Sequence, residues 1–551
     1  MLGSLHHYAH APSPWKGQGW LNAVLISVCL ILILPVLALV ITAMGDNRDL
    51  MQHLIETVLF RYLSNTMILI AGVGILTLGI GVTTAWVVSR YEFPFRHSLS
   101  WMLLLPMAIP SYIIAYVYTG FLDYAGPVQS LIRQHYGFTS WKQYWFPEIR
   151  SMGGAIFVMG LVLYPYVYLM ARTGFGQIPT RVFEATLLTG RSLIKHVGLP
   201  MGRPAIIAGL ALVLMEVVAD FGTVDFFAVE TISLGVYNVW LGMNSITTAA
   251  QLALMAFVLV FILLGSERYG RNKNRFVNTR SGITGVPRAE AEGLWRVVLP
   301  LICLFPIILG FILPVTILVH FSIGQGVGHM SDITSAVVQT LLVAGLGMVV
   351  IMASALTIGI ISCYVPSQFG RLLAGLSATG YAFPGTVLAL GVLAAIGYID
   401  QGWHWIGLAV FDAKWGPLLG GGIVMLILAY MVRFQAVGLG AVQSALEGMP
   451  STLVPASRVM GNGFVISIRR VVLPLIRPAV LAGGLLVFVD IMKELPMTLL
   501  LRPFDFNTLA TITYQYAHDE LIEKAALPAL MIVLTGLLPV IIIQFYFRPR
   551  K

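Results

Sequence analysis

The chain has 551 residues, of which 58% are hydrophobic and only 10% are charged. A mean hydropathy of +0.86 excludes a soluble protein of this length, which could not bury so much apolar surface, whereas a protein embedded in lipid need not. The net charge of +9 fits an excess of Lys and Arg in cytoplasmic loops, so we expect a lipid bilayer and no nucleic acid as partner.

Twelve apolar runs are long enough to cross a bilayer, which takes about 20 residues each. Continuous apolar runs, rather than alternating ones, indicate helices. We therefore predict an all-α multi-pass membrane protein. The predicted spans are 21–43, 64–89, 99–121, 152–171, 204–227 and 249–265 in the first half, and 297–321, 335–363, 371–396, 417–433, 478–500 and 526–547 in the second.

Basic residues gather in loops that we place in the cytoplasm. The stretch 266–296 carries seven Lys and Arg residues against three glutamates, and the loops 172–203 and 433–477 are also basic. The C-terminal Arg548, Arg550 and Lys551 follow the same trend. An even number of spans then puts both termini in the cytoplasm.

One phrase occurs twice, because Leu199-Pro200-Met201-Gly202-Arg203-Pro204-Ala205 returns 274 residues later as Leu473-Pro474-Leu475-Ile476-Arg477-Pro478-Ala479. A repeat at half the chain length means two copies of one folding unit. We expect two homologous six-helix bundles with pseudo-two-fold symmetry. The expected divisions are a tail with the first helix (1–63), a first transmembrane unit (64–265), a cytoplasmic linker (266–296), a seventh helix with an outer loop (297–334) and a second transmembrane unit (335–547).

A short polar segment precedes each Leu-Pro. The first copy begins at Glu184-Ala185 and reaches Gly190, and the second contains Ala456 and ends at Gly461. Local rules predict a short amphipathic helix that ends at Gly, a turn, and Pro at the start of the next helix. An ordinary surface helix would have the same pattern.

The spacing Glu-Ala-x-x-x-x-Gly before Leu-Pro-x-x-x-Pro resembles the EAA loop of bacterial type I ABC-importer permeases. The resemblance implies a fused pair of permease units in the bacterial inner membrane, with two copies of an ATP-binding subunit docked on the two loops. It also implies a periplasmic or extracellular substrate-binding protein, and ATP bound by the partner rather than a cofactor bound stably here. The implied ATPase-coupling residues are Glu184, Ala185, Gly190, Leu199, Pro200, Ala456, Gly461, Leu473 and Pro474.

Two departures from that pattern predict unequal ATPase contacts. Pro455 stands where the second loop should have its acidic residue, and the first loop is three residues shorter between Gly and Leu-Pro. A second resemblance concerns the segments 219–227 and 493–511, which are similar to those of ferric-iron permeases. Fused permeases for thiamine, polyamines and phosphonates share the architecture, so these cargoes stay open.

Four acids lie inside apolar stretches and are related by the repeat: Glu216 with Asp490, and Asp220 with Glu494. The spacing i, i+4 predicts that each pair shares one helical face. A carboxylate deep in a bilayer costs roughly 2.5–3.5 kcal/mol unless it is wet or paired, so we expect these acids to line a substrate pathway between the halves. Two other roles fit the same sequence pattern: the acids could hold neighbouring helices together through hydrogen bonds, or they could line a wet outer vestibule.

A ferric ion prefers hard oxygen ligands, so it could bind these four acids transiently. A polyamine would also suit them, and an anion would be repelled unless Lys493 outweighed the acids. We expect Lys493 to pair with a neighbouring carboxylate, and Asp225 to belong to a vestibule or cap.

No lysine follows a glycine, so the chain has no P-loop, and it contains no His-Glu-x-x-His motif. We therefore expect a transport subunit rather than an enzyme, with ATP hydrolysed by a separate subunit. An ion-coupled secondary transporter, whose carboxylates would relay protons, is the alternative from another class. The long basic loops argue against it.

Overall fold

The computed structural model describes residues 19–272, 285–323, 330–364, 368–450 and 452–546. Within these ranges, ten helices are long and apolar enough to cross a membrane, and one further helix pair passes the same test with a bend of 89°. The only strands described there are β1 (Tyr91–Glu92) and β2 (Ala289–Glu290), which pair in parallel. The prediction of an all-α membrane protein is confirmed.

Several predicted spans differ from the helices that form. The span 99–121 is the bent pair Arg96–Ala108 and Ser111–Tyr136, because Pro110 ends one helical stretch and precedes the next. The span 371–396 is displaced to Gly385–Phe411, after a similar break at Pro384. The apolar part of the helix at 249–265 covers Ile246–Ile262, which is shorter than a full span.

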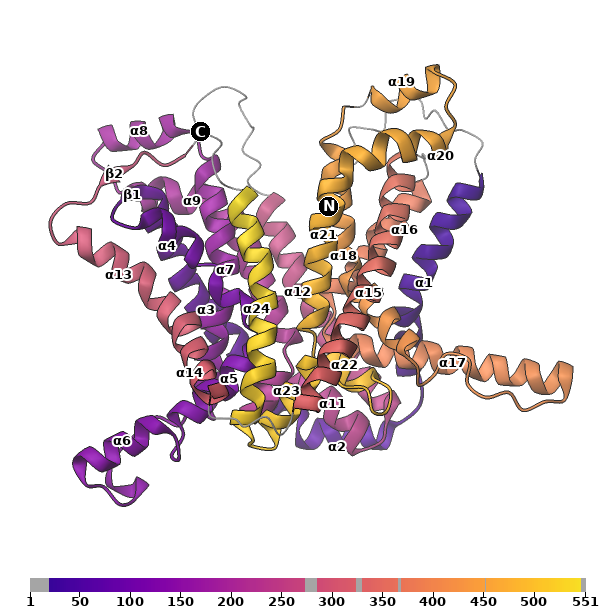
Figure 1. Cartoon of the computed structure of the whole chain (residues 1–551), viewed down its shortest axis with the longest axis horizontal. Helices are drawn as coiled ribbons and strands as arrows, with labels where there is room; N and C mark the ends of the chain where they lie inside the picture. Colours follow the sequence, from indigo (N-terminus) through magenta and orange to yellow (C-terminus); the bar gives the residue numbers. More distant parts are fainter. Residues whose placement is uncertain (1–18, 273–284, 324–329, 365–367, 451, 547–551) are drawn as a thin grey trace. The chain divides into compact units, whose positions relative to one another are not determined.

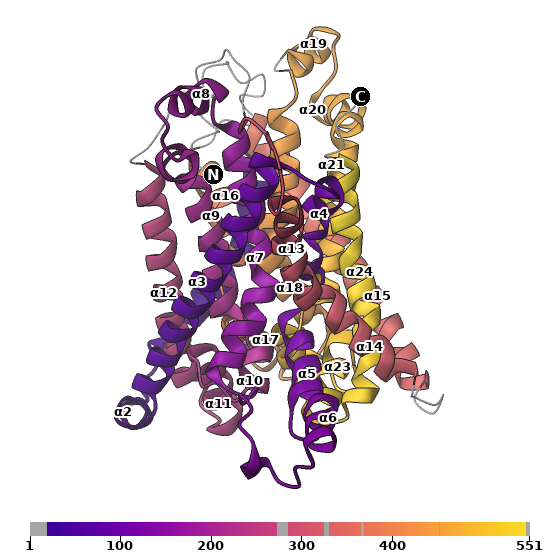
Figure 2. The same ribbon diagram turned by 90° about the vertical axis from the view of Figure 1, so that its left-hand side faces the viewer.

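The described residues form two compact units. The first-half unit comprises Arg48–Asn238, Met255–Met330 and Ile512–Lys551, and the second-half unit comprises Met1–Asn47, Val239–Leu254 and Ser331–Thr511. Within the first-half unit, both views place α8 at one end and α6 at the other (Figures 1 and 2).

The elements of the first-half unit, besides the two strands, are α2 (Arg48–Thr57), α3 (Leu59–Arg90), α4 (Arg96–Met102), η2 (Leu105–Ala108), α5 (Ser111–Leu122), α6 (Pro127–Tyr136), η3 (Trp141–Gln143), α7 (Met152–Gln177), α8 (Thr180–Leu188), η4 (Ile194–Gly198), α9 (Leu199–Ala219), α10 (Gly222–Phe226), α13 (Trp295–Ile307), η5 (Ile308–Ile312), α14 (Leu313–Ile323) and α24 (Ile522–Tyr546).

The second-half unit contains α1 (Gly19–Ala43), α15 (Met330–Tyr364), α16 (Gln368–Ser377), η7 (Ala378–Ala382), α17 (Gly385–Phe411), α18 (Ile423–Glu447), α19 (Leu453–Val459), α20 (Phe464–Ser467), η8 (Ile468–Val472), α21 (Leu473–Met492) and α22 (Pro496–Leu501). The helices α11 (Ile232–Gly242), α12 (Ile246–Asn272) and α23 (Leu509–His518) run across the divisions between the units.

The two halves of the sequence exchange their first helices. Helix α1 packs against α16 and α17 of the second-half unit, where the backbone of Pro35 closely approaches Gly391. The corresponding helix of the second half, α13 to α14, packs against α3, α4, α5 and α24 in the first-half unit. Each compact unit therefore takes its first helix from the other half of the chain.

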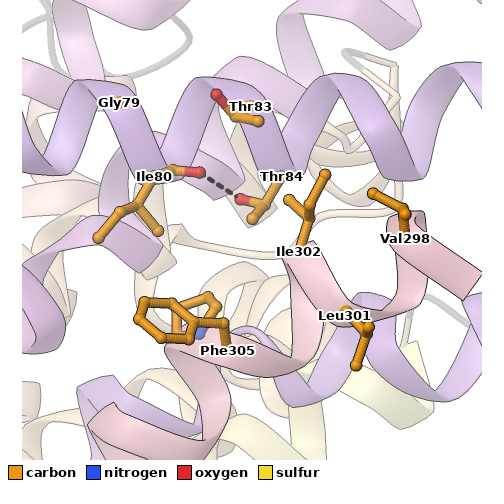
Figure 3. A pocket seen from close by; sticks show the side chains of 9 residues that line it. Gly79, Ile80, Thr83, Thr84, Val298, Leu301, Ile302 and Phe305 are labelled. Atoms are coloured by element: carbon orange, nitrogen blue, oxygen red, sulfur yellow. Dashed lines mark hydrogen bonds between the residues drawn. The ribbon is translucent and has the colours of Figure 1, made fainter.

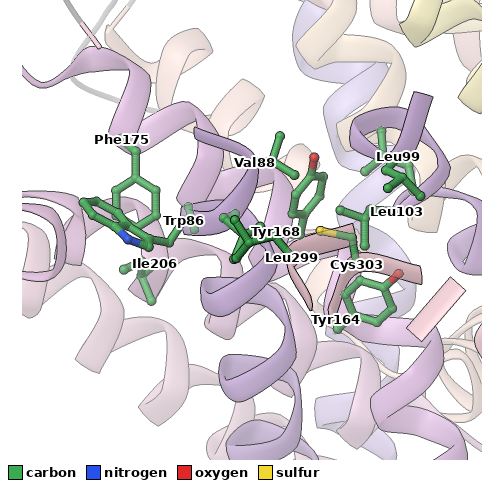
Figure 4. Close-up of a cluster of buried hydrophobic side chains, with 14 of the residues drawn as sticks. Trp86, Val88, Leu99, Leu103, Tyr164, Tyr168, Phe175, Ile206, Leu299 and Cys303 are labelled. Carbon is green, nitrogen blue, oxygen red and sulfur yellow. The ribbon is translucent and has the colours of Figure 1, made fainter. Parts of the chain in front are cut away.

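The core of the first-half unit lies where α3, α7, α9 and α13 meet (Figure 4). The ring of Trp86 packs edge-on against Phe175 with centroids 5.4 Å apart. Glycines let the helices approach these rings, since a Cβ at Gly198 would lie 2.6 Å from Trp86 and one at Gly202 would lie 2.8 Å from Phe175.

Three turns of π-helix occur in the described residues, and each is followed at once by Leu-Pro. In these turns the N–H of Leu199, Leu313 or Leu473 donates to the carbonyl five residues earlier. A proline within a helix lacks an N–H, and its ring collides with the carbonyl four residues before it. The wider π-turn moves that carbonyl, so the helix continues through the proline.

The glycine at position 198 gives a test of this packing. Gly198→Ala should lower the free energy of unfolding by about 1–3 kcal/mol, because the added methyl group would overlap the rigid Trp86 ring. Gly176→Ala in α7 is the matched control, since nothing lies within 4 Å of its Cβ position, and it should be neutral or slightly stabilising. Thermal unfolding of the purified chain in detergent measures both, and equal melting temperatures for the two variants would contradict the packing.

Candidate functional site: paired loops and acids

The first loop has the predicted helix, turn and helix. Helix α8 ends just before Gly190, whose φ of +66° lies in the left-handed region that suits glycine. Phe183 of α8 is fully buried, with its ring centroid 6.4 Å from that of Trp86. The loop is thereby fastened to the aromatic core described above.

The outward face of this loop is apolar at its tip. Glu184 and Ala185 are exposed, and so are Leu187 and Leu188, the latter at 91% of its full surface. Leu199 and Pro200 at the start of α9 are exposed as well. Large exposed apolar side chains beside a loop of this kind are typical of a protein interface.

The second loop has the same order of helix and glycine turn, but different contacts hold it to the rest of its unit. Helix α19 is followed by Gly461 with a φ of +83°, and Val459 and Met460 are 89% and 79% exposed. The buried Ser457 hydroxyl lies 2.9 Å from that of Ser467 and accepts a hydrogen bond from the Asn462 side chain at 3.2 Å. Hydroxyl and amide groups here replace the aromatic anchor of the first loop.

The remaining second-loop residues lie as the repeat requires. Ala456 is exposed in α19, Leu473 is half-buried at the start of α21, and Pro474 beside it is exposed. The three extra residues form most of α20, one helical turn that the first loop lacks before its π-turn. The difference in loop length is therefore one turn of helix.

The predicted helical pairing of the acids is wrong in one respect. Helix α9 ends at Ala219, just before Asp220, and α21 ends at Met492, two residues before Glu494. Glu216 and Asp490 are in the last turn of their helices and half-buried, whereas Asp220 and Glu494 are in the break that follows. The two acids of each pair therefore do not share one helical face.

Asp220 and Glu494 cap the short helices that follow the breaks. Asp220 Oδ1 accepts from the backbone N–H groups of Thr223 and Val224 at 2.9 and 3.3 Å. Glu494 accepts from the N–H groups of Met497 and Thr498, both at 2.9 Å. These donors are equivalent in the repeat, so both halves supply acceptors to the N–H groups at the start of the short helix in the same way.

The two capping acids have different additional partners. Asp220 Oδ2 accepts from the Ser111 hydroxyl at 2.6 Å. The repeat equivalent of Ser111 is Gly385, and the space there holds the guanidinium of Arg433, whose Nη1 lies 3.9 Å from Glu494 Oε1. A neutral hydroxyl in one half is thus replaced by a buried cation in the other.

The other acids are less enclosed. Asp490 Oδ1 lies 2.8 Å from Lys493 Nζ, so the predicted pairing of Lys493 with a neighbouring carboxylate is confirmed. Asp225 is in α10 and accepts a hydrogen bond from the Tyr514 hydroxyl. Burial, reinforced by the Asp225 carboxylate, raises the pKa of Tyr514 well above its usual range, so this phenol is a proton donor.

Sequence reasoning missed Ser111, Arg433, Tyr514 and His518. Arg433 had a signal, because a lone arginine within an apolar span needs a partner. Tyr514 and His518 stand four residues apart, which places them on one helical face. Their acidic neighbour, Asp225, is 289 residues from Tyr514, and no local pattern indicates it.

No group of three or more His, Cys, Asp or Glu side chains in the described part of the chain is arranged to hold a metal ion. A cavity of about 430 Å³ lies between α3 and α13, lined by Ile80, Leu301, Ile302 and Phe305 among others (Figure 3). Its Thr84 hydroxyl donates to the Ile80 carbonyl at 2.7 Å. No charged side chain lines this cavity, so it fits an acyl chain better than an ion.

Residues 355–551 match the family described as binding-protein-dependent transport system inner membrane component. Over 544 residues the chain is 24% identical to a Fe(3+)-transport system permease protein of Haemophilus influenzae, covering 97% of this chain and 99% of the relative. It is 22% identical over 534 residues to a ferric transport system permease protein of Actinobacillus pleuropneumoniae, covering 91% and 74%. A sulfate transport system permease protein of Escherichia coli is 25% identical over 274 residues, which cover 47% of this chain and 90% of the relative.

The duplicated helical fold thus carries, over residues 355–551, the domain of the inner membrane components of binding-protein-dependent transport systems. Over nearly its whole length the chain is similar to a transport system permease, and its internal repeat indicates two such copies joined in one polypeptide.

The capping role of the acids predicts a difference in stability. Asp220→Asn and Glu494→Gln should each lower the free energy of unfolding by about 1–3 kcal/mol, because an amide cannot accept every hydrogen bond that the carboxylate accepts. Asp490→Asn is the control and should cost less than about 1 kcal/mol, since its partner is one half-exposed lysine. Thermal unfolding in detergent compares them, and an equal loss in all three variants would refute the assignment.

Proposed function

We propose that this chain is the membrane-spanning subunit of an ATP-driven, binding-protein-dependent importer of ferric iron. The observation that carries the proposal is the alignment with the Haemophilus influenzae Fe(3+) permease, which covers both proteins almost completely. The alignment with the sulfate permease covers less than half of this chain. The relative that aligns over nearly the whole fused chain is therefore the one whose name gives Fe(3+) as its cargo.

In this proposal the two loops are the docking points for two copies of an ATP-binding subunit. The exposed apolar tips at Leu187, Leu188, Val459 and Met460 support it, because such residues need a partner surface. The basic composition of the loops supports a cytoplasmic position for the loops and for both chain termini. ATP binds the partner, and closure of the ATPase pair moves the two repeats so that access alternates between the two sides.

The unequal fastening of the loops supports unequal docking. The first loop has Glu184 and an aromatic anchor, whereas the second has Pro455, an extra helical turn and a serine–asparagine network. A rigid, ring-packed loop transmits force with little deformation. We assign the stiffer contact to the first loop.

Glu216, Asp220, Asp490 and Glu494 line the proposed cargo pathway, and the geometry divides them into two roles. Asp220 and Glu494 use their oxygens to hold the helix breaks, so they shape the pathway. Glu216 and Asp490 are half-buried in the last helical turns and are the acids that would meet a passing cation. Periplasmic or extracellular delivery by a substrate-binding protein completes the cycle.

The double variant Glu216→Ala with Asp490→Ala tests the pathway. Ferric uptake by the reconstituted complex should be lost, because a trication loses its hard oxygen ligands, while ATPase assembly should remain intact. Glu148→Ala with Asp519→Ala, which removes two exposed acids, is the control and should keep wild-type uptake. Wild-type uptake by the first variant would refute the pathway.

Gly190→Asp tests the coupling role. The variant should reduce co-purification of the ATPase at least tenfold, because it places a strained, charged residue beside the apolar tip, while the amount of inserted chain stays unchanged. Gly242→Asp adds the same charge at an exposed glycine of α11, with open space around it, and should bind the ATPase normally. Equal complex yields for the two variants would contradict the docking model.

ATP hydrolysis by the complex with its binding protein identifies the cargo. Ferric ion should stimulate hydrolysis, whereas thiamine, spermidine and molybdate should not. Stimulation by one of the other solutes, and not by ferric ion, would replace the proposed cargo. Uptake by the chain alone in liposomes, without any ATPase, would support an ion-coupled transporter instead.

A further inference from the structure

The side chains of Asp225 in α10 and of Tyr514 and His518 in α23 form a cluster. The Tyr514 hydroxyl donates a hydrogen bond to Asp225 Oδ2, and His518 Nδ1 lies 3.9 Å from the same oxygen. The rings of Tyr514 and His518 are stacked, with centroids 5.8 Å apart and an angle of 22° between their planes. A carboxylate, a phenol and an imidazole therefore point to one place within the first-half unit.

The local structure holds two of these groups in position. Asp225 belongs to α10, the short helix that Asp220 caps through Thr223 and Val224. The Tyr514 ring is buried and packs near Phe221, with centroids 6.0 Å apart. The carboxylate and the phenol are thus fixed by packing before any ligand arrives.

The third group lies at the surface of the chain. The His518 side chain is 64% exposed, whereas that of Asp225 is 19% exposed. Helix α9 has 21 residues and is about 30 Å long, so α10 lies one bilayer thickness away from the α8 loop. The cluster is therefore open at the end of the unit opposite to the ATPase loop.

The carboxylate, phenol and imidazole together favour one kind of cation. A hard trication prefers carboxylate and phenolate oxygen, and imidazole nitrogen is a common further ligand of iron. We propose that Asp225, Tyr514 and His518 form an entry site where ferric ion first binds the permease before it reaches Glu216. This inference rests on the proposed function, because it takes ferric iron as the cargo.

The binding step balances in charge and protons. Ferric ion bonds to one Asp225 oxygen, to the Tyr514 oxygen and to a ring nitrogen of neutral His518, and the phenolic proton leaves to solvent. Two ligand charges of −1 leave the ion with a net charge of +1. The three remaining positions of an octahedral shell stay open to water or to the donor that delivers the ion.

Small adjustments complete the geometry. Metal bonds of about 2 Å put neighbouring octahedral ligands about 3 Å apart, so the His518 ring must approach by roughly 1 Å. Its exposure permits that movement. Arg150, whose guanidinium carbon lies 5.3 Å from the ring centroid of Phe226, repels the ion less than a lone cation would, because it lies 3.3 Å from a Glu520 oxygen and 3.9 Å from an Asp123 oxygen.

Visible absorption tests the site directly, because a bond between ferric ion and phenolate produces a charge-transfer band. The full-length chain in nanodiscs is titrated with ferric nitrilotriacetate, and the band should appear at one equivalent. Tyr514→Phe should abolish it, and Asp225→Asn or His518→Gln should weaken iron binding at least tenfold. Tyr136→Phe, which changes an exposed tyrosine elsewhere, should leave the band unchanged.

Measurements of uptake by the complex test the entry site and the proposed ferric cargo independently of each other. If wild type imports ferric ion and Tyr514→Phe keeps the full absorption band, the entry site is refuted while the cargo stands. If wild type neither imports ferric ion nor couples it to ATP hydrolysis, the cargo itself is refuted. The expected result is that Tyr514→Phe raises the iron concentration needed for half-maximal uptake at least tenfold, with little change in maximal rate.

Discussion

The start of a helix leaves backbone N–H groups without acceptors, and where these groups are buried only the protein can supply an acceptor. This constraint governs both halves of the chain, because α9 and α21 each end at a break that another short helix follows. Asp220 and Glu494 solve it with equivalent hydrogen bonds to the start of the next short helix. The position of α10, and with it the position of Asp225, depends on that cap.

The two halves share this device but stabilise it differently. Ser111 supports Asp220 with a hydroxyl, whereas Gly385 leaves room for the Arg433 cation beside Glu494. Within the described residues, Nε and Nη1 of Arg433 lack a hydrogen-bond partner, so the cation depends on charge attraction. A buried ion pair is costly to break, because the remaining charge loses its compensation. The break in the second half is therefore less tolerant of change than that in the first.

Much of this architecture could be predicted from sequence, because the repeat and the long apolar runs can be recognised even where the exact ends of the helices cannot. The glycine turns at Gly190 and Gly461 followed from spacing alone. The helix ends before Asp220 and Glu494 were missed, because the apolar pattern continues through them and masks the breaks. The cluster at Asp225 could not be predicted, since it joins segments almost 300 residues apart through packing rather than pattern.

The exchange of first helices fixes an order of events during synthesis. The first-half unit needs α13 and α14 from the second half, and also α24, whose last described residue is Tyr546. About 300 residues separate Asn238 from that point, which takes roughly 15–60 s at ribosomal rates of about 5–20 residues per second. The early helices must wait in the bilayer with uncovered flanks until the ribosome has nearly finished. A premature stop codon in the second half before Thr511 would therefore leave both units incomplete, and one between Thr511 and Tyr546 would leave the first-half unit incomplete.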